Sequence, residues 1–150
     1  MNRAANRLPF LLAWSLATVL SLSAAMQAHA DPVSPADSRA ARGVVEAQLD
    51  AFAADDAKRA FSYAAPSIRE MFTTPDQFMA MVRGGYPVVY RPRSVTFLNP
   101  EWVQGQLVQG VHLTDSSGGL WLAIYRLERQ PDKSWRISGC EVQPSSGKMT

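Results

Sequence analysis

Residues 74–85 read TPDQFMAMVRGG, and the chain changes character on either side of them. Thr74 is a suitable N-cap, Pro75 fits the first helical position, and Gln77 stands where a capping-box side chain is expected. The two glycines that close the stretch can adopt the left-handed conformation that ends many helices. The stretch therefore predicts one complete helix with a defined start and end.

The chain before this helix also has a helical pattern. A helix is predicted to begin at Ser34-Pro35, because apolar residues then recur at intervals of three or four as far as Phe52. A second helix is predicted after the Asp55-Asp56 pair, and a short turn after Pro66. The first half of the domain is therefore expected to be helical.

After residue 85 the helical period gives way to alternation, with many aromatic and β-branched residues. We expect strands at 86–90, 95–98, 103–113, 120–129 and 135–142. The loops at 116–119 and 131–134 are short enough to make hairpins of the last three strands. Helices followed by a meandering antiparallel sheet predict an α+β domain in which the helices cover one face of the sheet.

The expected strand at 120–129 is apolar on both of its faces. Trp121 and Tyr125 share one face, whereas Leu122 and Ile124 share the other. Helices on one side of the sheet cannot cover both faces. We therefore expect the second face to meet a partner subunit in a homodimer or to lie beneath a long loop.

The N-terminus has the layout of a secretory signal peptide. Arg3 and Arg7 precede an uncharged run rich in Leu and Ala, and Ala28 and Ala30 fit the small-residue cleavage site. We expect cleavage after Ala30 and a periplasmic or secreted mature protein without a stable membrane anchor. The alternative is an uncleaved anchor, because residues 8–30 are numerous enough to cross a bilayer.

Cleavage would leave 120 of the 150 residues, which is the size of one domain. We expect a tether at 31–34, a single domain over 35–143 and a disordered tail over 144–150. Two of the 15 basic residues would leave with the signal peptide, so 13 would remain against 13 acidic residues. A neutral mature chain gives no reason to expect a nucleic-acid partner.

The single cysteine and the single histidine of the expected mature chain offer little chemistry. Cys140 has no partner for an internal disulfide, and we expect a small buried hydrophobe in a strand rather than the alternative, a reactive or intermolecularly bonded thiol. His112 is predicted on the polar face of its strand, outside any Ser-His-Asp or Cys-His arrangement. We expect no metal site, no cofactor and no identifiable catalytic residue.

Tyrosines and arginines gather in residues 85–93, GYPVVYRPR, where the helices should meet the sheet. In one interpretation they line a cleft, with Arg91 or Arg93 holding a carboxylate while the tyrosines stack or hydrogen-bond. In the alternative they pack as aromatics, with the arginines reaching the surface. Together with the inward face of the central strand, they give these candidate ligand-binding residues: Tyr86, Tyr90, Arg91, Trp121 and Tyr125.

Four short segments follow one another along the mature chain: QLDAF at 48–52, TPDQF at 74–78, MVRGGYP at 81–87 and WRISG at 135–139. In this order they resemble a bacterial family catalogued as domain of unknown function 4864, and the resemblance covers nearly all of the mature chain. The pattern is also similar to the wider NTF2-like superfamily. That similarity implies N-terminal helices across a strongly curved sheet, enclosing a cone-shaped pocket. No activity comes with the family, so it implies no functional residue.

Three functions fit these observations. The first is a non-catalytic module that binds a small apolar or carboxylate ligand, or a protein partner. The second, suggested by the superfamily resemblance, is an enzyme of the ketosteroid-isomerase or polyketide-cyclase kind, using an acid with Tyr86 or Tyr90 for proton transfer. The third is a purely structural homodimer. We favour the first, because the strand pattern places no carboxylate or histidine inside the pocket.

Overall fold

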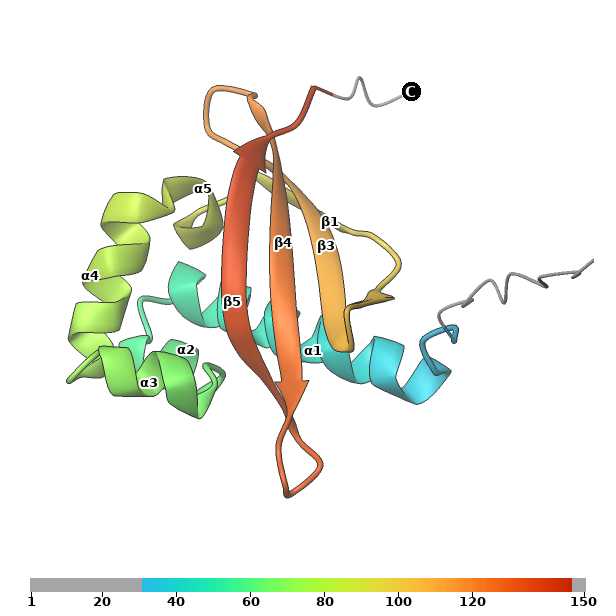
Figure 1. Cartoon of the computed structure of the whole chain (residues 1–150). Coiled ribbons are helices and arrows are strands. Elements are labelled where there is room, and N and C mark those ends of the chain that lie inside the picture. The colour runs from blue at the N-terminus through green and yellow to red at the C-terminus, as the bar shows by residue number, and fades with distance from the viewer. Residues whose placement is uncertain (1–30, 147–150) are drawn as a thin grey trace, which may run out of the picture.

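Helices make up the first half of the described chain and strands the second (Figure 1). The structure is a computed structural model that describes residues 31–146, so the expected signal peptide at 1–30 and the last four residues of the expected tail lie outside it. The helices are α1 (Pro35–Ala53), α2 (Ala57–Ser62), α3 (Pro66–Met71), α4 (Pro75–Gly85) and α5 (Pro87–Tyr90). The strands are β1 (Ser94–Phe97), β2 (Glu101–Val103), β3 (Gln106–Thr114), β4 (Leu120–Arg129) and β5 (Trp135–Pro144).

The strands form one antiparallel sheet in the order β1-β3-β4-β5, and β2 pairs with β3 beyond the end of β1. In Figure 1 helix α1 runs behind the sheet, while α2, α3 and α4 stand beside β5. The α+β fold with N-terminal helices on a sheet is thereby confirmed. Membership of the NTF2-like superfamily remains a prediction. No helix of the described residues is both long and apolar enough to span a membrane.

The predicted helix starts are confirmed by their caps. Side-chain oxygens of Ser34, Asp56 and Thr74 each accept a hydrogen bond from the amide three residues further on, at 3.0, 3.0 and 3.2 Å. The side chain of Gln77 closes the third cap from the other side, because its Oε1 accepts from the amide of Thr73 at 3.2 Å. Local chemistry thus fixes where α1, α2 and α4 begin.

The core lies between α1 and the sheet face that carries Tyr125. Tyr125 and Leu127 are each 1% exposed, whereas Leu122 and Ile124 on the opposite face of β4 are half-buried. The predicted alternation of the central strand is therefore confirmed. The other buried residues of this core include Val45, Leu49 and Phe52 of α1, Leu107, Val111 and Leu113 of β3, and Trp135 and Ile137 of β5.

Residues 86–90 were predicted as a strand, and that prediction is wrong. Pro87 holds the first position of α5, where its fixed φ favours a helical turn, and the amide of Tyr90 donates to the carbonyl of Tyr86 at 3.0 Å. Val88 and Val89 are buried. A single turn is too short to show a helical period, so the two valines suggested a strand.

The predicted strand over 103–113 is confirmed over 106–113, which lie in β3, but its start is wrong, because a tight turn at 104–105 separates Val103 from the rest. Gln104 and Gly105 have φ values of 50° and 79°, the left-handed pair that a type I′ hairpin requires. The turn pairs Val103 with Gln106 and so makes β2 and β3 separate strands. A glutamine at the first turn position, where Asn or Asp is usual, concealed the hairpin.

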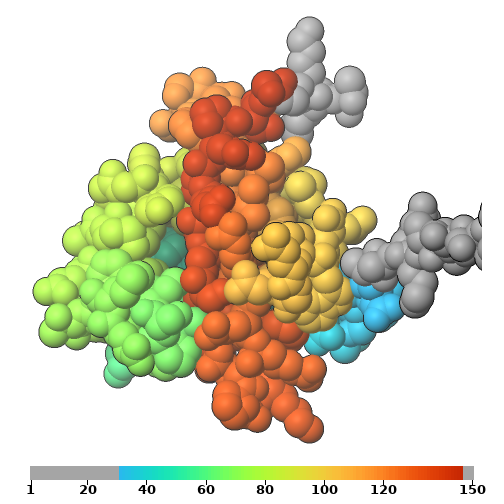
Figure 2. All heavy atoms as spheres, viewed as in Figure 1, coloured from blue at the N-terminus to red at the C-terminus, as the bar shows by residue number. Residues whose placement is uncertain are grey.

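The outer face of the sheet is partly covered from within the chain. A Cβ atom at Gly110 would lie 3.0 Å from Cδ1 of Leu98, so Leu98 packs directly against the backbone of β3. In Figure 2 the yellow-to-gold segment around β1 and β2 lies over this face. One of the two expected coverings, a loop, is therefore present over part of the face.

Candidate functional site

A cavity of about 330 Å³ lies between the helices and the inner face of β4 and β5. Figure 2 shows a hollow between the green helices and the red strand β5, with teal α1 at its floor. Met71, which is 71% exposed, marks where the cavity reaches the surface. The described lining residues are Gln48, Phe52, Ala64, Ile68, Met71, Phe72, Phe78, Met81, Val82, Tyr86, Val89, Tyr125, Ile137, Ser138, Gly139 and Cys140.

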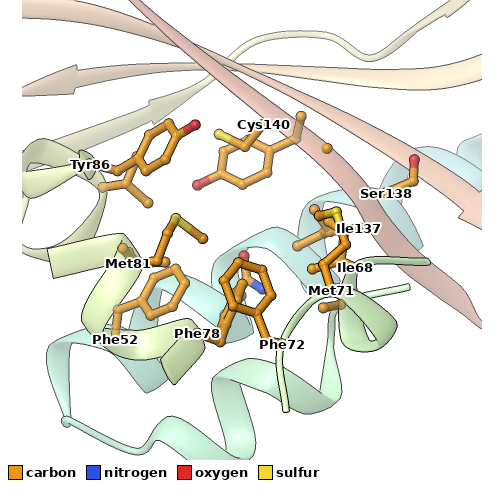
Figure 3. A pocket seen from close by; sticks show the side chains of 16 residues that line it. Phe52, Ile68, Met71, Phe72, Phe78, Met81, Tyr86, Ile137, Ser138 and Cys140 are labelled. Atoms are coloured by element: carbon orange, nitrogen blue, oxygen red, sulfur yellow. The ribbon is translucent and has the colours of Figure 1, made fainter. Parts of the chain in front are cut away.

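Aromatic side chains form the helical wall of this cavity. The ring of Phe78 lies 6.0 Å from that of Phe52 and 5.6 Å from that of Phe72, in tilted and edge-on arrangements. Figure 3 shows these three residues along one side of the cavity and Tyr86 and Cys140 along the other. The contacts hold a rigid apolar wall, because α1 and α4 are both anchored in the core.

A β-bulge at Ser138 shapes the sheet wall. Tyr125 pairs with Cys140, but Leu127 pairs with Ile137, so β5 carries one residue more than β4 between these pairs. The extra residue switches the alternation, and Ile137 and Cys140 both face the cavity although their numbers differ in parity. Without the bulge, one of the two would point to the outer face.

The rim of the cavity is fixed by backbone hydrogen bonds across the edge of β5. The amide of Ala65 donates to the carbonyl of Ile137 at 2.8 Å, and the amide of Ile137 donates to the carbonyl of Tyr63 at 2.9 Å. Ala64 and Ile137 thereby form a short parallel bridge. The link between α2 and α3 thus covers part of the open edge of the sheet and holds α3 at the cavity mouth.

Polar groups are few in the lining, and two of them are already engaged. Nε2 of Gln48 donates to the carbonyl of Ala60 at 3.1 Å, and Oγ of Ser138 donates to the carbonyl of Arg126 at 3.3 Å. Tyr125 differs, because its buried hydroxyl has no hydrogen-bond partner among the described residues beyond the Cys140 thiol beside it, and that thiol is at most a weak partner. Of the described lining residues, none carries a carboxylate, imidazole, ammonium or guanidinium group.

The two ionisable groups of the sheet wall stay neutral. Burial raises the pKa of Tyr125 well above its usual value, and the nearby Cys140 thiol raises it further. Burial also raises the pKa of Cys140 to about 12. The thiol is therefore protonated at physiological pH and is not a nucleophile there, although Cys140 as a whole is half-buried rather than buried as expected.

The five ligand-binding residues predicted from the sequence do not lie in one site. Tyr86 and Tyr125 line the cavity. Tyr86 also borders a second depression of about 350 Å³, which is lined by Arg91 and Trp121 as well. Tyr90 lines neither, and its hydroxyl donates to the carboxylate of Asp55.

The second depression is more polar than the cavity, and Asp115, the one acid of its described lining, already accepts several hydrogen bonds. Asp115 accepts from Nε1 of Trp121 at 2.7 Å, from the amide of Gly119 at 2.8 Å, and from the amide and hydroxyl of Ser117, both at 2.9 Å. These bonds, that from Trp121 above all, lower the pKa of Asp115 to about 2. Arg91 is paired with Asp55 at 2.8 Å. The depression thus holds charges that are already satisfied within the chain.

Most of the cavity wall cannot be recognised from the sequence, because Phe72, Phe78, Met81 and Ile137 have the pattern of ordinary core residues. The bulge that directs β5 toward the cavity left no signal that strand alternation could use. His112 pairs with Leu122 on the outer face and lies away from the cavity. No group of three His, Cys, Asp or Glu side chains suited to a metal ion occurs within residues 31–146.

Fold and site together define a small α+β domain with a charge-free apolar cavity between its helices and its sheet. The family model described as domain of unknown function (DUF4864) matches residues 34–150, and the chain belongs to that family. No curated protein and no solved structure matches the chain.

Proposed function

We propose that this protein is an exported module that binds a small apolar ligand in the cavity. The cavity itself carries the proposal, because its volume lies at the lower end of the about 300–1,000 Å³ typical of ligand sites. Its lining is apolar apart from a few polar groups, as in such sites. A fully packed core would leave no space of this size.

The segments that carry the family resemblance support the proposal. Each of the four contributes to the lining, so they meet in space although they are distant in sequence. Their lining residues are Gln48 and Phe52, then Phe78, then Met81, Val82 and Tyr86, and finally Ile137, Ser138 and Gly139.

The lining favours binding over proton-transfer catalysis. Such an enzyme needs an acid or a histidine with a shifted pKa inside the pocket, and the described lining contains neither. A carboxylate and a tyrosine do meet at Asp55 and Tyr90, but outside the cavity. There the hydroxyl of Tyr90, together with Arg83 and Arg91, lowers the pKa of Asp55, which makes it a weaker base.

Two tryptophan substitutions on neighbouring positions of α4 test ligand binding. Met81 lines the cavity, whereas Ala80 is exposed on the same helix. We expect ethylbenzene to shift amide NMR signals of the cavity residues saturably in the wild type and in Ala80→Trp. Met81→Trp should lose the response, because the indole fills space that the ligand needs. The proposal fails if the wild type shows no saturable shifts at the cavity.

Export is tested separately, at the N-terminus. The proposal rests on Arg3, Arg7 and the apolar run that ends at Ala28-His29-Ala30. N-terminal sequencing of the protein from the periplasm or medium should begin at Asp31 and read Asp-Pro-Val-Ser. A chain that retains Met1 would contradict cleavage and would favour the uncleaved anchor.

A further inference from the structure

We infer that the ligand of the cavity is uncharged and carries a carbonyl-type oxygen that accepts a hydrogen bond from Tyr125. The inference rests on the proposed binding function and narrows the class of ligand. It excludes from this cavity the carboxylate ligands that the arginines of residues 85–93 suggested. Its two supports are the charge-free lining and the hydroxyl of Tyr125, which has no partner beyond the weak one that the Cys140 thiol offers.

The lining disfavours a charged ligand because no described side chain in it can balance the charge. Neither Arg91 nor Arg83 lines the cavity, and both bond to Asp55. Tyr125 and Cys140 are held neutral by burial. An ionised carboxylate would therefore lose its hydration without gaining a partner, which is strongly unfavourable.

The hydroxyl of Tyr125 supplies the polar contact of the inferred ligand. Two fully buried polar atoms of the described side chains lack a partner, Oε1 of Gln109 and the hydroxyl of Tyr125, and only Tyr125 lines the cavity. Buried polar groups are rarely left without a good hydrogen bond, so a hydroxyl that has only a thiol beside it, on a residue that lines the cavity, suggests a ligand atom as the partner. The proton remains on Tyr125, since its pKa is raised, and the hydroxyl can donate it.

A small movement is needed before a ligand reaches this hydroxyl, because the oxygen is closed off from solvent. Met81 lines the same cavity and has three rotatable bonds, so it can shift at little cost. The aromatic wall can remain in place meanwhile. The cavity thus combines a rigid apolar side with one adaptable side chain.

Three probes of nearly equal shape test the inference: ethylbenzene, acetophenone and benzoate. They differ only in the group attached to the ring, which is apolar, a neutral acceptor or an anion at pH 7. In NMR titrations of the purified protein we expect the first two to bind and benzoate not to bind detectably. Tyr125→Phe should lower the affinity for acetophenone relative to ethylbenzene about fivefold, the usual effect of one lost hydrogen bond.

Tyr86→Phe is the matched control, because Tyr86 lines the same cavity. It should leave the ratio of the acetophenone and ethylbenzene affinities unchanged. An unchanged ratio in Tyr125→Phe, or a change in Tyr86→Phe alone, would overturn the assignment of the hydrogen bond. Benzoate binding as tight as that of acetophenone would overturn the neutral-ligand inference, and this comparison needs only the wild type. If no probe binds at all, the proposed binding function fails instead.

Discussion

The carboxylate of Asp55 accepts a hydrogen bond from the hydroxyl of Tyr90, 35 residues further along the chain. Arg83 and Arg91 donate to the same carboxylate at 2.9 and 2.8 Å. Asp55 follows the C-cap of α1 with φ 56°, in the left-handed position that glycine usually occupies at a helix end. One aspartate therefore ends α1 and ties that end to α4 and α5.

Substitutions at Asp55 should separate its charge from its backbone role. Asn tolerates the left-handed conformation, so Asp55→Asn should lose only the charge-assisted bonds, whereas Asp55→Ala should lose both contributions. We expect the melting temperature to fall from the wild type to Asn and again to Ala. High salt should reduce the difference in melting temperature between the wild type and Asp55→Asn, because it screens exposed ion pairs. An alanine variant as stable as the wild type would show that this junction contributes nothing.

Thr74→Ala should destabilise the protein by about 1 kcal/mol, because Oγ1 of Thr74 accepts the amide of Gln77 at the start of α4. The measurement is the free energy of unfolding in urea. Thr73→Ala is the matched control, since Thr73 is exposed and contributes its backbone amide rather than its side chain to the cap. Equal effects of the two substitutions would contradict the cap.

Much of the fold could be predicted from the sequence because the deciding signals are local. The caps at Ser34, Asp56 and Thr74 and the last two hairpins depend on residues within a few positions of one another. The errors arose where local signals were ambiguous. Val88 and Val89 suit a strand in isolation, and the left-handed turn at Gln104 has a residue that rarely adopts it.

The candidate site was harder to predict because distant contacts create it. Tyr86 and Tyr125 were selected from the sequence and do line the cavity, but Arg91 and Trp121 line a different depression. The direction of Ile137 and Cys140 depends on the bulge at Ser138, which is visible only once β4 and β5 are paired. No pattern within one strand contains that information.

The thiol of Cys140 should react slowly in the native protein. Its pKa is raised to about 12 by burial, so at pH 8 its thiolate fraction is roughly 10³-fold below that of an ordinary cysteine. Alkylation by iodoacetamide at pH 8 should therefore be slow in buffer and become fast in urea. Rapid labelling of the folded protein, or a disulfide-linked dimer on a non-reducing gel, would contradict the raised pKa of this half-buried cysteine.

Acid should destabilise the hairpin between β3 and β4. The pKa of Asp115 is lowered from its ordinary 3.8 to about 2, so its contribution to stability is complete above about pH 4 and is lost as the pH falls toward 2. The fluorescence of Trp121, whose Nε1 bonds to Asp115, should report the loss. Asp115→Asn should be less stable than the wild type at pH 7. Its stability should also fall less than that of the wild type between pH 4 and 2. An identical acid profile in the two proteins would refute this role.

The two faces of β4 can be distinguished by one charge on each. Leu127 is 1% exposed on the inner face, so Leu127→Glu would bury an unpaired carboxylate at a cost of several kcal/mol, enough to unfold a domain of ordinary stability. Leu122 is half-buried on the outer face beside His112, where a glutamate side chain can turn toward water. Circular dichroism should therefore show a folded Leu122→Glu and an unfolded Leu127→Glu.

Sedimentation of the same samples tests the expected homodimer, because a dimer formed through the outer face should dissociate in Leu122→Glu while the subunit stays folded. A wild type that sediments as a monomer would instead leave the loop around Leu98 as the covering of that face. Loss of structure in Leu122→Glu would contradict the assignment of Leu122 to the outer face.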